Sequence, residues 1–167
     1  MKNLVDTRCR NVYLRPAEIH VSGRPDFVST ILGSCVSVTL YSSSARAGAI
    51  CHSLLPSGVI EDGFCYVDSS VKFIFEKLAA VAGTSEDFEA KLFGGSEIIG
   101  NRDSDNRVSV GARNVEAAIN ALADLGVPIV ASDTGGNSGR KIFFYTQTGE
   151  VYMRRVARAF TQIEASR

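Results

Sequence analysis

The sequence lacks net charge, because its 167 residues carry 18 basic and 18 acidic side chains. A chain without excess charge has no overall field that would attract nucleic acid or an anionic membrane surface. We therefore expect no nucleic-acid partner, and we expect any partner to be recognised by local shape and chemistry.

Long hydrophobic runs are also missing. No stretch approaches the roughly 18 consecutive apolar residues of a membrane span, and Met1 to Asp6 contain no apolar run long enough for a signal peptide. These features favour a cytoplasmic protein without membrane insertion. With 45% hydrophobic residues the chain can still bury a core of its own, and its length fits one domain.

Histidine is scarce and the cysteines are scattered. The chain has two histidines and four cysteines, with no compact Cys-x-x-Cys or His-x-x-x-His pair. Such pairs are typical of zinc sites, so a metal-binding module built on Cys51, His52 and Cys65 is an alternative with little support. We expect thiols rather than a disulfide framework, no metal, and no other cofactor.

One of these cysteines, Cys35, follows a glycine turn and begins a segment whose residues 36–41 alternate between apolar and polar side chains. This alternation is typical of a half-buried strand. A second apolar run, 47–55, follows the serine cluster 42–44, so the two segments are predicted to form a hairpin. If Cys35 pairs with His52, the turn is centred between Ser43 and Ser44. The two side chains then face each other on one side of the sheet, and the other side is core.

The remaining pattern predicts a single α/β domain with a mixed, mostly antiparallel sheet core covered by two main packing helices. Residues 1–10 are expected to be a lead-in, 11–157 the domain and 158–167 a tail. The predicted segments are extended chain at 11–22 broken at Pro16, strands at 26–31, 88–93 and 127–132, helices at 67–83 and, after Asn114, as far as Gly126, an exposed loop at 99–110, and a hairpin of 141–147 with 150–156.

The pairing of Cys35 with His52 suggests nucleophilic catalysis. A thiol has a pKa near 8.5, so a catalytic cysteine needs a partner such as an imidazolium to stabilise the thiolate. Backbone N–H groups at Gly33 and Ser34 are candidate donors to an oxyanion. Ser29 or Thr30, on the preceding strand, could orient the imidazole. The alternative is that Cys35 is a buried structural residue, because cysteine is among the most buried residue types.

Five sequence blocks, in this order and spacing, resemble the CheD family of bacterial chemotaxis proteins, which deamidate glutamines of chemoreceptors. The resemblance covers roughly residues 10–157. The blocks are Leu32-Gly33-Ser34-Cys35-Val36, Gly48 to Pro56, Gly94-Gly95-Ser96, Val110-Gly111-Ala112-Arg113-Asn114 and Asp133-Thr134-Gly135-Gly136-Asn137.

The resemblance implies a three-layer α/β sandwich and a cysteine hydrolase that converts receptor glutamines to glutamates and releases ammonia. It implies that Cys35 is the nucleophile and His52 the general base. The third residue of the family is a threonine six positions before the cysteine, which corresponds here to Ser29, with Thr30 beside it. Methyl-accepting chemoreceptors would be the protein substrate, and a CheC-type phosphatase a further partner.

Two other functions remain open from the sequence. One is a non-enzymatic adaptor that binds a CheC-type phosphatase or a receptor, with Cys35 as a relic. The other is an esterase that acts on receptor glutamyl methyl esters, because hydrolysis of the ester would pass through the same thioester.

Overall fold

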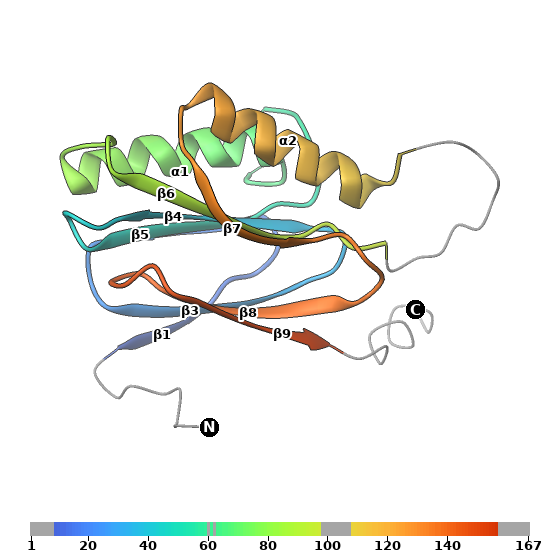
Figure 1. The fold of residues 1–167 in the computed structure, drawn as a ribbon, viewed down its shortest axis with the longest axis horizontal. Helices are drawn as coiled ribbons and strands as arrows, with labels where there is room; N and C mark the ends of the chain where they lie inside the picture. Colours follow the sequence, from blue (N-terminus) through green and yellow to red (C-terminus); the bar gives the residue numbers. More distant parts are fainter. Residues whose placement is uncertain (1–8, 60, 62, 98–107, 157–167) are drawn as a thin grey trace.

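The part of the chain that the structure describes folds into three layers: two helices, a five-stranded sheet beneath them and a four-stranded sheet below that (Figure 1). The computed structural model describes residues 9–59, 61, 63–97 and 108–156. In chain order the elements are β1 (Arg10–Tyr13), β2 (Glu18–Ser22), β3 (Asp26–Leu32), β4 (Val36–Ser42), β5 (Ala47–His52), α1 (Val67–Ala82), β6 (Phe88–Gly94), α2 (Val110–Asp124), β7 (Ile129–Thr134), β8 (Gly139–Tyr145) and β9 (Val151–Val156).

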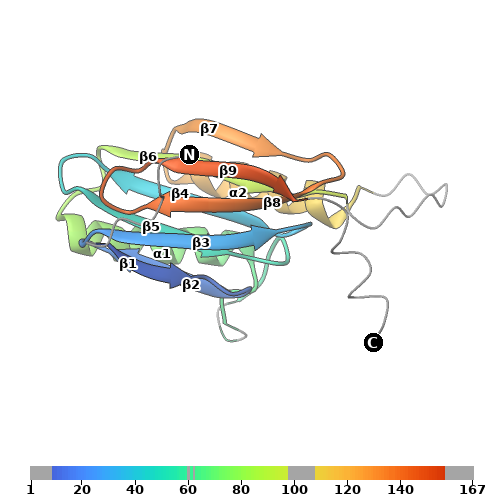
Figure 2. The same ribbon diagram turned by 90° about the horizontal axis from the view of Figure 1, so that it is seen from below.

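The predicted three-layer α/β fold is confirmed, and its strands divide into two sheets. One sheet has the order β2-β5-β4-β6-β7 and the other β1-β3-β8-β9. Neighbouring strands are antiparallel except for the parallel pairs β1 with β3 and β6 with β7. Figure 2 shows the four-stranded sheet from its outer side, with both helices on the far side of the molecule. The predicted tail and most of the predicted 99–110 loop lie outside the described residues.

The five-stranded sheet is covered on both faces. Val38 and Leu40 of β4 and Ala49 and Cys51 of β5 pack against the helices. Ile50 lies on the opposite face, in a second apolar cluster between the two sheets. The expectation of a half-buried strand at β4 is therefore wrong, because the second sheet encloses the face that carries its polar residues. Of the polar side chains on this face, Tyr41 donates its hydroxyl to the Gln147 carbonyl at 2.9 Å, whereas Oγ of the buried Ser37 has no hydrogen-bond partner among the described residues.

Asp87 fixes the bend between β4 and β5. Its carboxylate accepts hydrogen bonds from the backbone N–H of Ser44 at 2.8 Å and from the hydroxyl of Ser42 at 2.9 Å. The Ser44 bond is the largest of the effects that lower the pKa of Asp87 to about 2. Ser42 pairs with Ala47, so the turn is centred one residue later than predicted. The predicted register was thus wrong by two positions, a shift that leaves every side chain on its predicted face.

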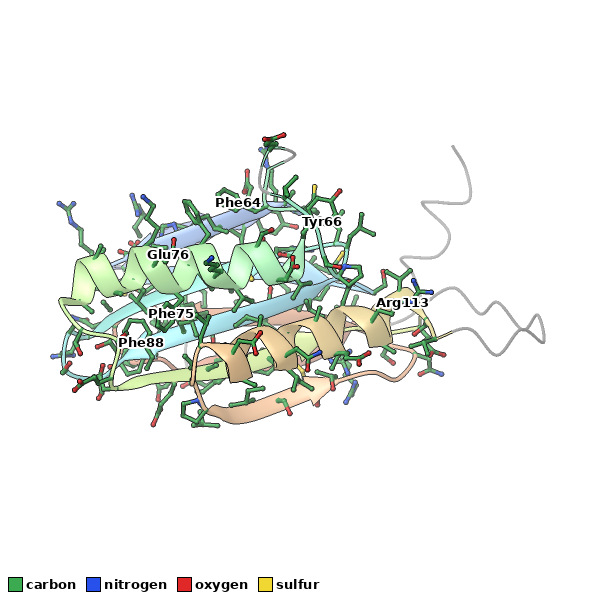
Figure 3. All side chains as sticks on the ribbon, turned by 90° about the horizontal axis from the view of Figure 1, so that it is seen from above. Phe64, Tyr66, Phe75, Glu76, Phe88 and Arg113 are labelled. Carbon is green, nitrogen blue, oxygen red and sulfur yellow. The ribbon has the colours of Figure 1, made fainter. Side chains whose placement is uncertain are left out.

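Helix α2 begins earlier than the sequence suggested. The predicted start lay after Asn114, whereas the helix includes Val110 to Asp124. Ser109 is the N-cap, and its hydroxyl accepts a hydrogen bond from the backbone N–H of Ala112. Figure 3 shows α1 and α2 side by side over the five-stranded sheet. Among the described residues, no helix has the length and apolar character that crossing a membrane requires.

Candidate active site

Cys35 lies on the short connection that carries the chain from β3 in one sheet to β4 in the other. The three carbonyl groups of this connection are anchored to the protein interior. The Gly33 carbonyl accepts from the Ser96 N–H at 3.0 Å, the Cys35 carbonyl from the Gly95 N–H at 2.9 Å, and the Ser34 carbonyl from Nδ2 of Asn114 at 3.0 Å. In a trans peptide the N–H points opposite to the carbonyl. The N–H groups of Ser34 and Cys35 therefore point away from these anchors, the direction that an oxyanion site requires.

Gly94 and Gly95 form the turn against which the Cys35 connection packs. Gly94 has φ of 110°, and a Cβ atom there would collide with the Cys35 carbonyl oxygen. Gly95 also has a positive φ, 69°, and a Cβ atom there would lie 2.8 Å from the Gly111 carbonyl oxygen. Glycine is therefore required at both positions, for backbone conformation and for close approach. In the sequence, this pair is notable only as part of the block Gly94-Gly95-Ser96 and has no assigned role.

Arg140, in β8 of the four-stranded sheet, binds the same turn. Its side chain is only 1% exposed, and its guanidinium donates to Oγ of Ser96 at 2.6 Å, to the Gly135 carbonyl at 2.8 Å and to the carboxylate of Asp133 at 2.7 Å. The glycine-rich segment after β7 is thereby joined to the turn that binds Cys35. No sequence pattern indicated this contact, because an arginine in an alternating strand is normally expected to be exposed.

His52 is the last residue of β5 and lies on the same face as Cys35. The backbones of Val36 and Ser53 exchange two hydrogen bonds, of 3.0 and 2.9 Å, which makes Cys35 and His52 diagonal neighbours in the hairpin rather than a directly opposed pair. Diagonal neighbours have Cα atoms about 7–8 Å apart, a separation that long side chains span. Cys35 also packs against the apolar cluster between the two sheets.

Thr30 of β3 orients the imidazole from the second sheet. Its Oγ1 lies 2.7 Å from Nδ1 of His52 and 2.7 Å from the carbonyl oxygen of Leu14. A carbonyl can only accept, so the single hydroxyl hydrogen of Thr30 goes to Leu14. Nδ1 of His52 must then carry the hydrogen that it donates to Thr30. This leaves Nε2 unprotonated, with a lone pair that can accept a proton.

Of the two hydroxyls predicted to orient His52, the structure brings Thr30 to the ring and not Ser29. Successive residues of a strand point to opposite faces. Val28 and Leu32, which alternate with Thr30, belong to the cluster between the sheets. Ser29 therefore points to the outer face of the four-stranded sheet, next to its strand partners Tyr13 and Phe143. The same alternation directs Cys51 to the helix side, away from His52.

The imidazole of His52 is neutral at pH 7. The residue is 2% exposed, and burial is the main cause that lowers its pKa from 6.5 to about 4, with Glu18 opposing the shift. This differs from the imidazolium that we expected from the sequence, because the second sheet removes the water that would stabilise the charge. A neutral ring with a free Nε2 can accept a proton from the Cys35 thiol during attack.

The same burial predicts a pH dependence of stability. His52 is protonated below pH 6.5 in the unfolded chain but only below about pH 4 in the folded protein. The unfolded state therefore binds more protons between these values, and stability falls as the pH is lowered from 6.5 to 4, by about 3 kcal/mol in total. Urea unfolding across this range measures the slope. His52→Gln should flatten it, and an equal slope in that variant would contradict the assignment.

Replacing Thr30 with valine should separate its role from that of Ser29. Thr30→Val keeps the shape but removes the hydroxyl, so His52 loses the partner that holds hydrogen on Nδ1. We expect turnover per folded molecule to fall about 10²-fold, less than when a charged orienting group is lost. The matched control is Ser29→Ala, which should change turnover by less than about two-fold because Ser29 does not contact the ring. A larger loss in Ser29→Ala than in Thr30→Val would contradict the geometry.

Comparison with known proteins gives one family and several close relatives. Residues 55–155 match the family described as CheD chemotactic sensory transduction. A probable chemoreceptor glutamine deamidase CheD 2 from Geobacter sulfurreducens is 47% identical over 148 residues, covering 89% of this chain and 91% of the relative. Probable chemoreceptor glutamine deamidases CheD from Maridesulfovibrio salexigens and Thermococcus kodakarensis are each 37% identical, covering 88% and 82% of this chain and 92% and 88% of the relatives.

Proposed function

The chain belongs to the CheD family, and we propose that it deamidates glutamine side chains of chemoreceptors with Cys35 as nucleophile and His52 as general base. The observation that supports these roles most is the 2.7 Å contact between Thr30 and Nδ1 of His52, which leaves Nε2 free on the face that Cys35 shares. Thr30 and His52 come from strands of different sheets, and Cys35 comes from the connection that joins the two sheets. A purely structural cysteine needs no such partners.

The reaction begins with transfer of the thiol proton of Cys35 to Nε2 of His52 as sulfur attacks the amide carbon of the glutamine. The N–H group of Ser34 stabilises the oxyanion that forms. The carbon–nitrogen bond then breaks, and the imidazolium gives its proton to the departing ammonia. A low pKa favours this step, because a buried imidazolium releases its proton readily.

Hydrolysis completes the cycle. His52, neutral again, takes a proton from water, and the hydroxide attacks the thioester carbon. The carbon–sulfur bond breaks to give the carboxylic acid and the Cys35 thiolate, which recovers its proton from His52. The acid then loses its proton to the released ammonia, which gives glutamate and ammonium. Both half-reactions use one oxyanion site. No cofactor is required, because each proton that leaves one group is accepted by another.

The proposed substrate is a glutamine on the helical bundle of a methyl-accepting chemoreceptor, so the reaction would take place in the cytoplasm. An uncharged amide needs no countercharge at the site, in keeping with a chain of zero formal net charge. We extend the proposal to a CheC-type phosphatase as second partner, which the family resemblance implies. Co-elution of the two purified proteins tests that partnership separately from catalysis.

The experiment that tests the proposed function is product analysis with purified protein and a receptor cytoplasmic fragment. A deamidase releases ammonia and converts identified glutamines to glutamates, which peptide mass spectrometry locates. An esterase releases methanol from methylated receptor instead. An adaptor binds the fragment and leaves every glutamine unchanged. Either of the last two results would overturn the proposal.

A further inference from the structure

We propose that Asn114 is a positioning residue that fixes the spacing between the nucleophile and the base; this rests on the proposed function. Its Nδ2 donates one hydrogen bond to the Ser34 carbonyl at 3.0 Å and another to the Leu54 carbonyl at 2.9 Å. Ser34 directly precedes Cys35, and Leu54 lies two residues after His52. A single carboxamide therefore joins the chain at the nucleophile to the chain at the base.

The helix that carries Asn114, α2, also packs directly against the Gly94-Gly95 turn beside Cys35. A Cβ atom at Gly111 would lie 2.5 Å from the Gly95 carbonyl oxygen, so α2 approaches this turn backbone to backbone. The N–H of Gly95 in turn donates to the Cys35 carbonyl. The first turn of α2 is thus fixed relative to Cys35. Asn114, on the next turn, connects the helix to the segment that directly follows His52.

The chemistry of the contact accounts for an asparagine at this position. Asn114 is fully buried, on the same helix face as Ala118 and Leu122. Both groups that it contacts are carbonyl oxygens, which only a donor can satisfy, and a carboxamide NH₂ supplies two hydrogens at one point. Within the described part of the chain its Oδ1 has no hydrogen-bond partner. An unsatisfied buried acceptor destabilises the fold. This cost indicates that the role of the amide lies in the two hydrogen bonds that its NH₂ group donates.

The test compares Asn114→Asp with Asn120→Asp, which makes the same change at an exposed position of α2. An aspartate keeps the shape of asparagine but offers no donor when ionised and only one when burial keeps it protonated, so it cannot hold both carbonyls. For Asn114→Asp we expect kcat for receptor deamidation to fall about 10²-fold per folded molecule, because small displacements of reacting groups are costly, while KM stays within about two-fold. Alkylation of Cys35 by iodoacetamide at pH 7 should slow in parallel. Asn120→Asp should leave all three quantities unchanged.

A kcat for folded Asn114→Asp within about two-fold of wild type would overturn the proposal, as would a loss that only follows the loss of folded protein. If Asn114→Asp does not fold, Asn114→Ser replaces it: its one donor should give intermediate rates, and wild-type rates would overturn the proposal. If the wild type deamidates nothing, the proposed function fails, yet the rate of Cys35 alkylation still decides whether Asn114 positions the thiol.

Discussion

Cys35→Ala is expected to abolish receptor deamidation, with a loss of at least about 10⁴-fold, while the protein stays folded. Removal of a nucleophile eliminates the covalent route and leaves only what binding and the oxyanion site contribute. Cys35 is half-buried, so the substitution removes little packed volume. Peptide mass spectrometry of the receptor fragment measures the loss, and thermal unfolding checks the fold.

Cys65→Ala is the matched control for this result, because Cys65 is also half-buried. It should keep full activity. Cys51 cannot substitute for Cys35, because burial raises its pKa to about 11 and keeps the thiol protonated. Activity that persists in Cys35→Ala and disappears in Cys65→Ala would show that Cys65, and not Cys35, is the nucleophile.

His52→Gln is expected to reduce turnover about 10³-fold, because the glutamine amide can donate to Thr30 but cannot accept a proton from the thiol. The residual rate should rise with pH as hydroxide deprotonates the thiol directly. In the wild type, His52 is already neutral near pH 7, so its titration should not limit the rate until the pH approaches 4. Initial rates across pH measure both effects.

His20→Gln serves as the control for histidine loss. Nε2 of His20 contacts Asp26 at 2.8 Å, not Cys35 or His52. Turnover per folded molecule should therefore remain at the wild-type level. Equal losses in the two histidine variants would indicate damage to the fold rather than removal of a base.

The shared face of Cys35 and His52 could be predicted from the sequence, because side-chain alternation depends only on parity along each strand. Their exact pairing could not. The bend between β4 and β5 is fixed by Asp87, more than 40 residues away, through its bonds to Ser42 and Ser44. The local sequence contains the serines, but the carboxylate that selects one register of the β4–β5 pairing lies outside it.

The choice between Ser29 and Thr30 also required the structure. Alternation states that one of them points inward, but which one depends on how β3 packs against the five-stranded sheet. A buried hydrogen-bonding role for Asn114 could have been predicted from the sequence, because a polar residue on an otherwise apolar helix face needs buried partners. The identity of those partners, the Ser34 and Leu54 carbonyls, depends on tertiary contacts between three segments of the chain.

The most direct test of the account is ¹⁵N NMR of the His52 imidazole in the purified protein, with His52→Gln used to assign the signals. We predict a neutral ring at pH 7 with its hydrogen on Nδ1, and protonation only near pH 4, as the hydrogen bond through Thr30 to Leu14 and the burial of the ring require. Thr30→Val should release the ring to a mixture of tautomers. A hydrogen on Nε2, or an imidazolium at pH 7, would contradict the account.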